Sequence, residues 1–432
     1  MRTHISTAVG QLDADSAHER FDSVPAAVDA IARGDMVVIV DDEDRENEGD
    51  LVMAAEHATI EKMAFIIRHT SGFVCVAMTE DRAAALGLPP MVPAAGNAEV
   101  FGTAFGVSVD ALHGVTTGIS AADRAVTARA LADPQTRPGD LSRPGHVMPL
   151  LARPGGVLER RGHTEATVDL CRMAGLESVG VLCELVDDDG EMSRRDALIR
   201  FARLHHLKMI RVRDIVEHRR QREQLVTRIS RARVPTTAGD FIGHVFRAHD
   251  GVEHIALVAG TPHLAGSAAA TPLVRVHSEC LTGDILGSLR CDCGPQLQDS
   301  LTAIAAEGTG VVVYLRGQEG RGVGLGAKLA AYALQEDGYD TVDANLELGL
   351  PVDARDYAVA AAILKELGVS RARLITNNPD KITALSRYGV DVISRVARPP
   401  HVNHHNIDYL RTKERRLGHS ILPVVDITES AV

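Results

Sequence analysis

The strongest constraint on the fold is a densely charged stretch near the middle of the chain, DIVEHRRQREQLVTRISRARVPT, at residues 214–236. It mostly lacks the broad apolar face with which a helix packs against a core, so we interpret it as a helical or extended connector. A chain of 432 residues is also too long for one ordinary hydrophobic core. We therefore expect two domains, residues 1–222 and 223–432, with the boundary near Arg222.

Apolar segments of strand length and capped helical segments occur in both halves, without strict alternation of strand and helix. In the first half we expect helices at 23–35, N-capped by Ser23, and at 163–175, with strands at 36–40, 73–78, 105–110, 179–185 and 208–212. In the second half we expect a helix at 325–338, with strands at 240–249, 253–260, 273–279, 311–315 and 373–376. This pattern favours the α+β class: two mixed α/β domains in tandem, each with its own sheet and active site.

Net charge and hydropathy restrict the classes of partner that the chain can have. The formal net charge of −12 disfavours a general nucleic-acid-binding protein, which needs a basic face. No apolar run approaches the length of a membrane span. The first 20 residues are polar and mixed in charge, with no signal-peptide core, so we expect a disordered lead-in and a cytoplasmic protein.

An acidic segment, DDEDRENEGD at residues 41–50, directly follows an apolar strand. Crowded carboxylates repel one another unless a cation joins them, and magnesium prefers a few carboxylates plus water and substrate oxygens. Arg45 would suit a phosphate or an enediol oxygen. Charge runs are usually solvated loops, but a position at the end of a strand favours a functional site.

Weaker signals accompany this segment in the first half. His146 follows a Pro-Gly turn, and Glu184 ends an apolar strand. His163 and Thr164 begin a helix whose free amides would favour a phosphate, with Arg160 close by. Taken singly, each could be structural: a satisfied histidine, an N-cap or the last residue of a strand.

Together these segments resemble 3,4-dihydroxy-2-butanone 4-phosphate synthase of riboflavin biosynthesis over about residues 20–218, with DDEDRENEGD, IRHTSGFVCVAMTEDR, GVTTGISAADR, RPGHV, GHTEAT and LCEL in order. The resemblance implies conversion of ribulose 5-phosphate to the butanone phosphate plus formate. It implies that Glu46 and His163 bind magnesium or manganese, and that His146 and Glu184 are the essential acid/base residues. It also implies substrate contacts at Arg45, Glu46, Asp50, Arg160, Arg161, Gly162, His163, Thr164 and Glu184.

Three of the six cysteines, Cys280, Cys291 and Cys293, lie in one short segment, HSECLTGDILGSLRCDCGPQL. Three thiolates with a Cys-x-Cys pair predict a zinc site. A catalytic site would keep a position for water, whereas His277 or Glu279 as a fourth ligand would make the site structural. A disulfide is disfavoured in an acidic chain without a signal peptide. The remaining cysteines lie in apolar runs and are expected to be core thiols: Cys75, Cys171 and Cys183.

A glycine-rich segment downstream could bind phosphates through its backbone amides, assisted by Arg275 and Arg321. The part GVGLGA, residues 322–327, formally fits the dinucleotide-binding fingerprint. Its context does not fit, because the polar insert RGQEGR separates it from the preceding strand and no second strand ends at an acid about 20 residues later. We therefore expect no nicotinamide site.

The second half resembles GTP cyclohydrolase II from about Val234 to Leu417, on the ordered motifs HSECLTGD, RCDCGPQL, QEGRGVGL, DARDY and ITNNPDK. The resemblance implies hydrolytic opening of the imidazole ring of GTP, with release of formate and pyrophosphate. It implies zinc on the three cysteines and magnesium on the triphosphate. It implies GTP contacts at Arg275, Val276, His277, Ser278, Glu279, Gln296, Glu319, Gly320, Arg321, Thr341, Thr376 and Lys381.

The same resemblance implies catalytic roles for three further residues. Asp353 matches a proton acceptor, Arg355 a nucleophile toward the α-phosphate, and Tyr332 a tyrosine near the ring-opening site. A guanidinium is almost always protonated, so a charge-stabilising role for Arg355 is an alternative.

We therefore expect a bifunctional riboflavin-biosynthesis enzyme, with small-molecule substrates only. A homodimer is expected because family sites of this kind are built at subunit contacts. Two alternatives stay open: one half could be a catalytically dead scaffold, or the cysteines could form a structural zinc knuckle in a nucleotide-binding regulator. The intact motifs in both halves and the acidic composition favour the bifunctional enzyme.

Overall fold

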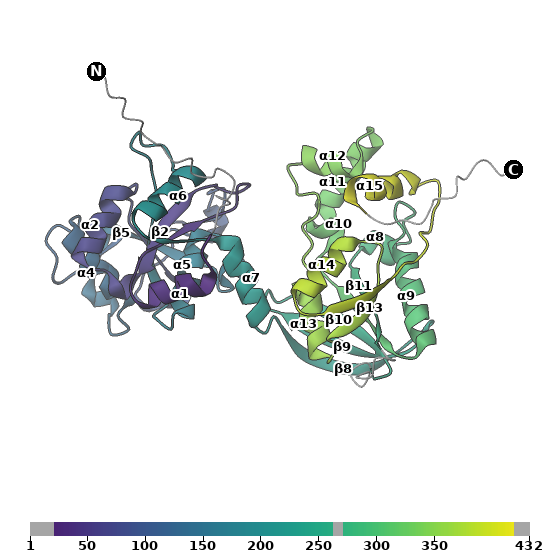
Figure 1. Cartoon of the computed structure of the whole chain (residues 1–432). Helices are drawn as coiled ribbons and strands as arrows, with labels where there is room; N and C mark the ends of the chain where they lie inside the picture. The colour runs from purple at the N-terminus through teal and green to yellow at the C-terminus, as the bar shows by residue number, and fades with distance from the viewer. Residues whose placement is uncertain (1–20, 262–270, 419–432) are drawn as a thin grey trace, which may run out of the picture. The chain divides into compact units, whose positions relative to one another are not determined.

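The computed structural model describes residues 21–261 and 271–418 (Figure 1). It divides into two compact units, Met1–Arg219 and Arg220–Val432. The expected disordered lead-in lies outside the described residues. Among the helices of the described ranges, none is long and apolar enough to cross a membrane.

The first unit is built on a mixed sheet with the strand order β4-β5-β3-β6-β2-β1-β7. The pairs β3/β5 and β1/β7 are parallel, and the other neighbours are antiparallel. The strands are β1 (Val37–Val40), β2 (Gly49–Ala54), β3 (Cys75–Thr79), β4 (Val109–Ala111), β5 (Leu141–Ala152), β6 (Val179–Glu184) and β7 (Lys208–Arg211).

Helices cover both faces of this sheet. The apolar side chains of β1 show the division, because Val37 and Ile39 belong to one buried cluster and Val38 and Val40 to the other. The first cluster includes α1 (Val24–Ala32), α5 (His163–Met173) and α7 (Val212–Arg222). The second includes α2 (Ile60–His69), α3 (Glu80–Ala85), α4 (Ala121–Ala132) and α6 (Arg195–Leu204).

Local signals explain most of these elements. The Ser23 side chain accepts a hydrogen bond from the Ala26 amide and caps α1, as the sequence predicts. The predicted strand at 105–110 is wrong in extent, because only Val109–Ala111 forms β4. Phe105 makes an isolated bridge to Leu150 instead. Gly106 bridges Pro90 in the same irregular stretch, where a Cβ would lie 3.1 Å from the Pro149 Cβ.

The second unit has its own mixed sheet, in the order β14-β13-β11-β12-β10-β9-β8. The neighbours β14, β13, β11 and β12 run parallel, and β12, β10, β9 and β8 run antiparallel. The strands are β8 (Val226–Thr236), β9 (Gly239–Ala248), β10 (Glu253–Ala259), β11 (Leu273–Ser278), β12 (Gly310–Leu315), β13 (Arg371–Ile375) and β14 (Asp391–Val396). Two units with separate mixed sheets confirm the predicted fold class.

The helices of the second unit gather on the sheet and at the carboxyl ends of its parallel strands (Figure 1). Leu301 and Ile304 of α9 pack on one face, in a cluster with Phe241, Val312 and Ile375. The helices are α8 (Leu281–Asp284), α9 (Cys293–Glu307), α10 (Glu319–Gly322), α11 (Leu325–Glu336), α12 (Thr341–Glu347), α13 (Ala358–Glu366), α14 (Pro379–Arg387) and α15 (Ile407–Leu417). Parallel strand ends of this kind are the usual place for a ligand site.

The charged stretch 214–236 is only partly a connector. Its first part continues α7 to Arg222, but its second part is β8, an edge strand paired with β9 from Val226 to Thr236. Sequence reasoning missed this strand because seven of its eleven residues are exposed in succession. An edge strand with polar residues on both faces has no period-2 apolar signal, and its arginines discourage pairing with other chains.

Candidate active sites

The buried Asp41 organises the acidic segment of the first unit. Its carboxylate accepts hydrogen bonds from the amides of Glu46 (3.0 Å) and Glu48 (2.9 Å). Arg45 Nη1 donates to Asp41 Oδ2 and to Glu46 Oε2, both at 2.9 Å, and its guanidinium lies 4.9 Å from the Phe101 ring centroid. The loop that looked like a run of repelling charges is therefore folded around one buried carboxylate.

Glu46, Asp50 and His163 form a cluster of ionisable side chains in this unit. His163 Nδ1 lies 3.6 Å from Glu46 Oε2 and 3.7 Å from Asp50 Oδ1. Burial lowers the pKa of His163, but the two carboxylates outweigh it and raise the pKa to about 9. Burial raises the pKa of Asp50 to about 7. A divalent cation at this place would join the same groups.

The donor atoms of this cluster fit a hard divalent cation. Asp50 Oδ1 and His163 Nε2 are buried and have no hydrogen-bond partner among the described residues. Asp41, Glu46 and His163 each place one ligand atom within 4.8 Å of the others. Both oxygens of Asp41 already accept backbone amides, so Glu46 and His163 are the better ligands.

The N-terminus of α5 is open toward the cluster. Its N-cap is Gly162, which has no side chain to bond the first amides, and Thr164 is buried beside it. Arg160 is fixed by Glu165 Oε2 and Thr103 Oγ1, both at 2.7 Å. The structure brings these residues together with His163 as predicted, whereas Arg161 is exposed.

His146 has a buried carboxylate partner that the sequence did not reveal. Its Nδ1 lies 2.7 Å from Asp110 Oδ2, and its amide donates to Asp110 Oδ1 at 2.9 Å. Gly118 packs over the pair, and a Cβ there would lie 2.0 Å from Asp110 Oδ2. Asp123 holds this loop by accepting from the amides of Thr116 and Gly118. The imidazole is therefore oriented by one carboxylate, with Nε2 left for a substrate.

Sheet register places the predicted acid/base residues near the acidic cluster. Asp50 of β2 pairs directly with Glu184 of β6. Cys75 of β3 pairs with Leu182 of β6 and Met148 of β5, so Glu184 and His146 lie two residues beyond these pairs on the same side. The Glu184 carboxylate accepts a hydrogen bond from Ser71 Oγ at 3.0 Å.

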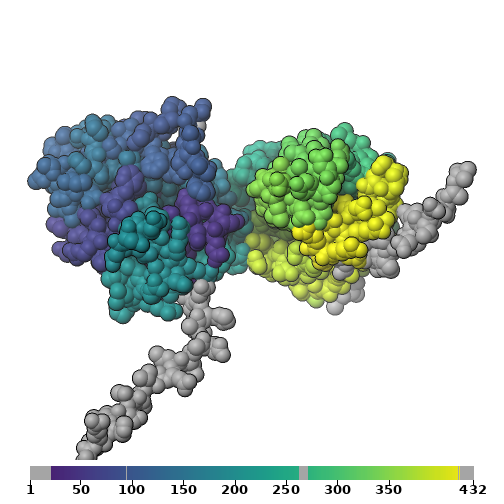
Figure 2. Space-filling view, turned by 90° about the horizontal axis from the view of Figure 1, so that it is seen from above, coloured from purple at the N-terminus to yellow at the C-terminus, as the bar shows by residue number. Residues whose placement is uncertain are grey.

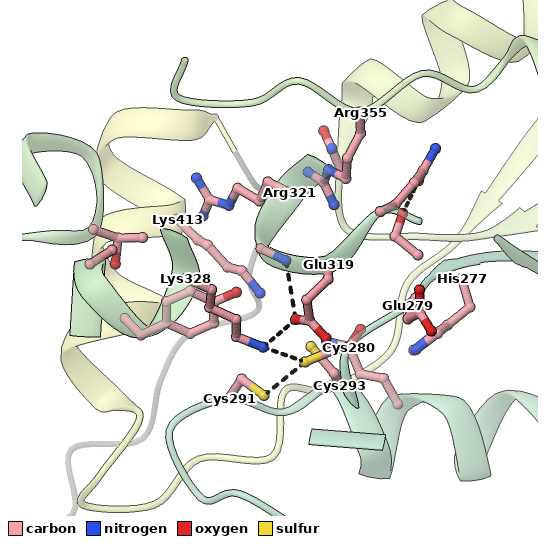
Figure 3. Close-up of a pocket in the computed structure, with 18 of the residues that line it drawn as sticks. His277, Glu279, Cys280, Cys291, Cys293, Glu319, Arg321, Lys328, Arg355 and Lys413 are labelled. Atoms are coloured by element: carbon pink, nitrogen blue, oxygen red, sulfur yellow. Dashed lines mark hydrogen bonds and ion pairs between the residues drawn. The ribbon is translucent and has the colours of Figure 1, made fainter. Parts of the chain in front are cut away.

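In the second unit, the candidate site lies at the carboxyl ends of β11, β12 and β13, where a pocket opens (Figure 3). The lining residues that the sequence predicted are Arg275, His277, Ser278, Glu279, Cys280, Cys291, Cys293, Gln296, Glu319, Gly320, Arg321, Tyr332, Thr341, Arg355, Thr376 and Lys381. Val276 is buried in β11 and contributes its carbonyl oxygen, which accepts from Lys381 Nζ at 2.9 Å.

The three thiols converge, as their spacing predicts. Their sulfur atoms lie within 4.8 Å of one another, and Cys280 Sγ and Cys291 Sγ are 3.7 Å apart. Gly283 allows this approach, because a Cβ there would lie 2.6 Å from Cys291 Sγ. Lys328 Nζ lies 3.2 Å from Cys280 Sγ. Hydrogen bonds from the other thiols, with Lys328, lower the pKa of Cys280. Three converging sulfur atoms fit a soft cation such as zinc.

Neither alternative fourth ligand is available in this arrangement. His277 Nε2 bonds Asp284 Oδ1 at 3.0 Å, and its ring stacks on Tyr314 with centroids 5.5 Å apart. Glu279 Oε2 accepts from the Gly317 amide at 2.7 Å. Figure 3 shows both side chains set apart from the three sulfurs. The fourth position of a tetrahedral ion would therefore face the pocket.

Buried cations dominate the rest of the pocket. Arg275 donates to Gln296 Oε1 at 2.8 Å, and the buried Lys381 donates to a backbone carbonyl. Burial and the neighbouring Arg275 and Arg355 hold the pKa of Lys381 well below its usual range. Such a cluster is costly without an anion, and a polyphosphate would relieve the cost.

The loop after β12 carries Gly320 and Arg321 in the left-handed region, at φ of 61° and 64°. The Ala354 amide donates to the Arg321 carbonyl at 2.9 Å, which ties this loop to the segment that contains Asp353 and Arg355. Arg355 Nε bonds both oxygens of Asp353, at 2.9 and 3.1 Å. Burial would lower the pKa of Arg355, but Asp353 outweighs it, so the guanidinium stays protonated.

Several pocket residues were missed by sequence reasoning. Lys328 bonds Cys280, Thr282 and Glu319, and Gln318 accepts from Ser278 Oγ at 2.7 Å. Tyr409 and Lys413 come from α15, in a segment for which we predicted no structure. The sequence signal for this last pair is weak: an i, i+4 spacing in a charged helix.

Comparisons with known proteins assign each unit to a family. A family model described as 3,4-dihydroxy-2-butanone 4-phosphate synthase matches residues 25–218, and one described as GTP cyclohydrolase II matches residues 227–397. The chain is 54% identical to the riboflavin biosynthesis protein RibBA of Rhodococcus jostii strain RHA1, over 94% of this chain and 98% of that protein.

Two further relatives cover the chain. It is 54% identical to the chloroplastic bifunctional riboflavin biosynthesis protein RIBA 1 of Arabidopsis thaliana, over 92% of this chain and 73% of that protein. A crystal structure of RibBX from A. baumannii, titled a two-domain 3,4-dihydroxy-2-butanone 4-phosphate synthase, matches with a TM-score of 0.67 and 35% identity, over 87% of this chain and 100% of that one.

Proposed function

Because this chain belongs to the family of bifunctional riboflavin-biosynthesis enzymes, we propose which of its residues carry out each reaction. The N-terminal half converts ribulose 5-phosphate to 3,4-dihydroxy-2-butanone 4-phosphate and formate. The C-terminal half hydrolyses GTP to a diaminopyrimidinone ribosyl phosphate, formate and pyrophosphate. We assign the first activity to residues 1–222 and the second to residues 223–432. The observation that carries the assignment is one metal-ligand cluster in each matched unit.

The acidic site is suited to enolisation of a sugar phosphate. Magnesium or manganese held by Glu46 and His163 would supply a Lewis acid for neighbouring substrate oxygens. The open N-terminus of α5 and Arg160 bind the phosphate. His146 and Glu184 move the protons, since each is held by a neighbouring side chain near the cluster. The remaining substrate contacts are Arg45, Asp50, Arg161, Gly162 and Thr164.

Asp110 is expected to be a positioning residue for His146. In Asp110→Asn, the amide cannot accept strongly from Nδ1–H, so the imidazole would lose the tautomer that leaves Nε2 basic. We expect kcat for ribulose 5-phosphate to fall by about 10²-fold, within the usual contribution of an acid/base group, with little change in KM. The pH profile of kcat should also differ from that of the wild type.

Asp189→Asn, on an exposed turn of the same unit, serves as the matched control. GTP hydrolysis by the same chain reports folding of the other unit. An Asp110→Asn enzyme with wild-type kcat and an unchanged pH profile would remove Asp110 from the mechanism.

The thiolate site is suited to attack of water on the imidazole ring of GTP. Zinc on Cys280, Cys291 and Cys293 would supply a Lewis acid that lowers the pKa of a bound water to about 7. Tyr332 lines the pocket on the same side as Lys328. The guanidinium of Arg290 lies 4.8 Å from the centroid of the Tyr332 ring. We assign the triphosphate, with its magnesium, to the buried cations. The full set of proposed GTP contacts, these cations included, is Arg275, Val276, His277, Ser278, Glu279, Gln296, Glu319, Gly320, Arg321, Thr341, Thr376 and Lys381.

For Arg355 we propose charge stabilisation at the α-phosphate rather than nucleophilic attack. A guanidinium held by two bonds to Asp353 has no free lone pair. The same pairing lowers the pKa of Asp353 against the opposing effect of burial, which makes it a weak proton acceptor. We therefore propose that Asp353 orients Arg355.

A homodimer in the cytoplasm remains part of the proposal. The first unit exposes large apolar side chains that a second copy could cover: Phe73, Met91, Val92, Val100, Phe101, Leu112 and Ile119.

Separate substrate assays test the bifunctional assignment. The purified chain should release formate from ribulose 5-phosphate with magnesium, and from GTP with zinc and magnesium. If one substrate gives no formate while the other is consumed, the silent half is a scaffold. A single competitive profile, in which each substrate blocks the other reaction, would contradict two independent sites.

A further inference from the structure

The last helix of the described chain, α15, lies beyond the part of the second unit that matches the cyclohydrolase family model, which ends at residue 397. The buried Asn406 anchors its start, since the side chain donates to the His401 carbonyl at 2.8 Å and accepts from the Asn403 amide at 2.8 Å. Leu410 is 1% exposed. The hydrogen bonds of Asn406 and the burial of Leu410 indicate that α15 is packed against its unit.

Its far end is tied to α12. Arg416 Nη1 bonds Asp340 Oδ2 at 2.6 Å and Asp343 Oδ1 at 2.7 Å. Asp340 caps α12, whose first residue, Thr341, lines the pocket. In the space-filling view, the yellow surface of the residues after 400 adjoins the green surface of the residues around 340 (Figure 2).

One face of α15 points at the pocket. Tyr409 and Lys413 are spaced i, i+4 and both line the pocket, and the Lys413 ammonium lies 4.2 Å from the Tyr409 ring centroid. Figure 3 shows the Lys413 side chain extending toward the thiol cluster from the side opposite His277.

Lys413 is nearly buried but only loosely paired. Its side chain is 13% exposed, and Nζ lies 3.6 Å from Asp292 Oδ1, beyond hydrogen-bond distance. Asp292 separates Cys291 from Cys293 and is held by Gln296 Nε2 at 2.6 Å. Gln296 in turn accepts from Arg275. An ammonium has three donors, and the pair with Asp292 and the hydrogen bond with Tyr409 leave one of them for an anionic ligand in the pocket.

The surrounding charges favour an anion at Lys413. Its charge lowers the pKa of the buried Lys381, together with burial, Arg275 and Arg355. Among the other pocket cations, Lys328 pairs with Glu319 and Arg355 with Asp353, so those charges are already balanced. Arg275, Arg321 and Lys381 have no ion pair with a carboxylate among the described residues of the pocket, and Lys413 has only the 3.6 Å pair with Asp292.

We propose that α15 forms one wall of the nucleotide pocket and that Lys413 binds a phosphate oxygen of GTP. This inference rests on the proposed GTP site and extends it to a segment outside the family match. Tyr409 positions the ammonium by a cation–π contact, and Arg416 holds the helix on α12.

The test compares four full-length variants: Lys413→Met, Lys413→Arg, Arg416→Met and Arg411→Met. We expect Lys413→Met to raise KM for GTP by about 10- to 100-fold, the effect of losing one charge-assisted hydrogen bond, while kcat changes little. Lys413→Arg should recover most of the affinity because it keeps the charge. Arg416→Met should raise KM without touching the pocket. Arg411→Met, whose exposed side chain pairs with Asp408, should behave as wild type.

Binding of a non-hydrolysable GTP analogue and of guanosine, measured by calorimetry, locates the contact. Lys413→Met should weaken the analogue and leave guanosine unchanged, with zinc content and formate release from ribulose 5-phosphate as in wild type. Equal analogue affinity in Lys413→Met and wild type would overturn the proposal, as would an equal loss for guanosine. A wild-type chain that does not hydrolyse GTP would instead refute the cyclohydrolase assignment itself.

Discussion

Cys293→Ser is expected to remove zinc from the protein and to reduce GTP hydrolysis by about 10³-fold or more, since a Lewis acid contributes several kcal/mol and each 1.36 kcal/mol is tenfold in rate. Serine is a hard, neutral ligand at neutral pH, and only two thiolates would remain to hold a soft cation. The change is made at the first residue of α9, where the side chain belongs to the pocket rather than to the apolar core. Zinc content by elemental analysis and formate release from GTP measure the two effects.

The same chain supplies the control for this variant. Formate release from ribulose 5-phosphate should stay at the wild-type rate, because the thiolates lie in the other unit. Cys171→Ser makes the same chemical change at a core thiol, which donates to the Val179 carbonyl, and should leave zinc content unchanged. Full zinc content in Cys293→Ser would mean that other residues hold the ion.

The sequence predicts the three cysteines as one ligand set because they lie in one short segment, whereas Glu46 and His163 lie in separate motifs that the family resemblance joins. Cys291 and Cys293 are adjacent in space by virtue of their spacing, and Cys280 joins them because Gly283 lets the chain return closely. Glu46 lies just before strand β2. Asp50 of that strand faces His163 at the start of α5. In these cases, local pattern and tertiary position point to the same site.

Other site residues depend on tertiary contacts that no local pattern specifies. Asp110 is 36 residues from His146, and Lys413 is about 120 residues from the thiols that it approaches. The sequence left the role of His277 equally open, because its bond to Asp284 depends on the folded structure. Strand β8 was missed for a related reason: an edge strand exposed on both faces has the composition of a linker.

His163→Ala is expected to reduce the rate of ribulose 5-phosphate conversion by about 10³-fold or more, while GTP hydrolysis continues. The imidazole is the group that Glu46 and Asp50 share, so its removal takes away the ion-pair partner of Asp50 and leaves Glu46 paired with Arg45. A divalent cation would then have one ligand fewer and a cavity beside it, and the Lewis acid would be lost from the substrate oxygens. Magnesium binding by calorimetry should weaken in parallel with activity.

His205→Ala is the matched control, since this histidine packs on Phe201, with ring centroids 4.5 Å apart, and belongs to no ligand cluster that the described residues form. It should keep both reactions and magnesium binding. If His163→Ala retained magnesium affinity but lost activity, His163 would act on the substrate instead of the metal. If it retained both, the acidic cluster would not be the catalytic site, and the assignment of Glu46 and Asp50 would fail with it.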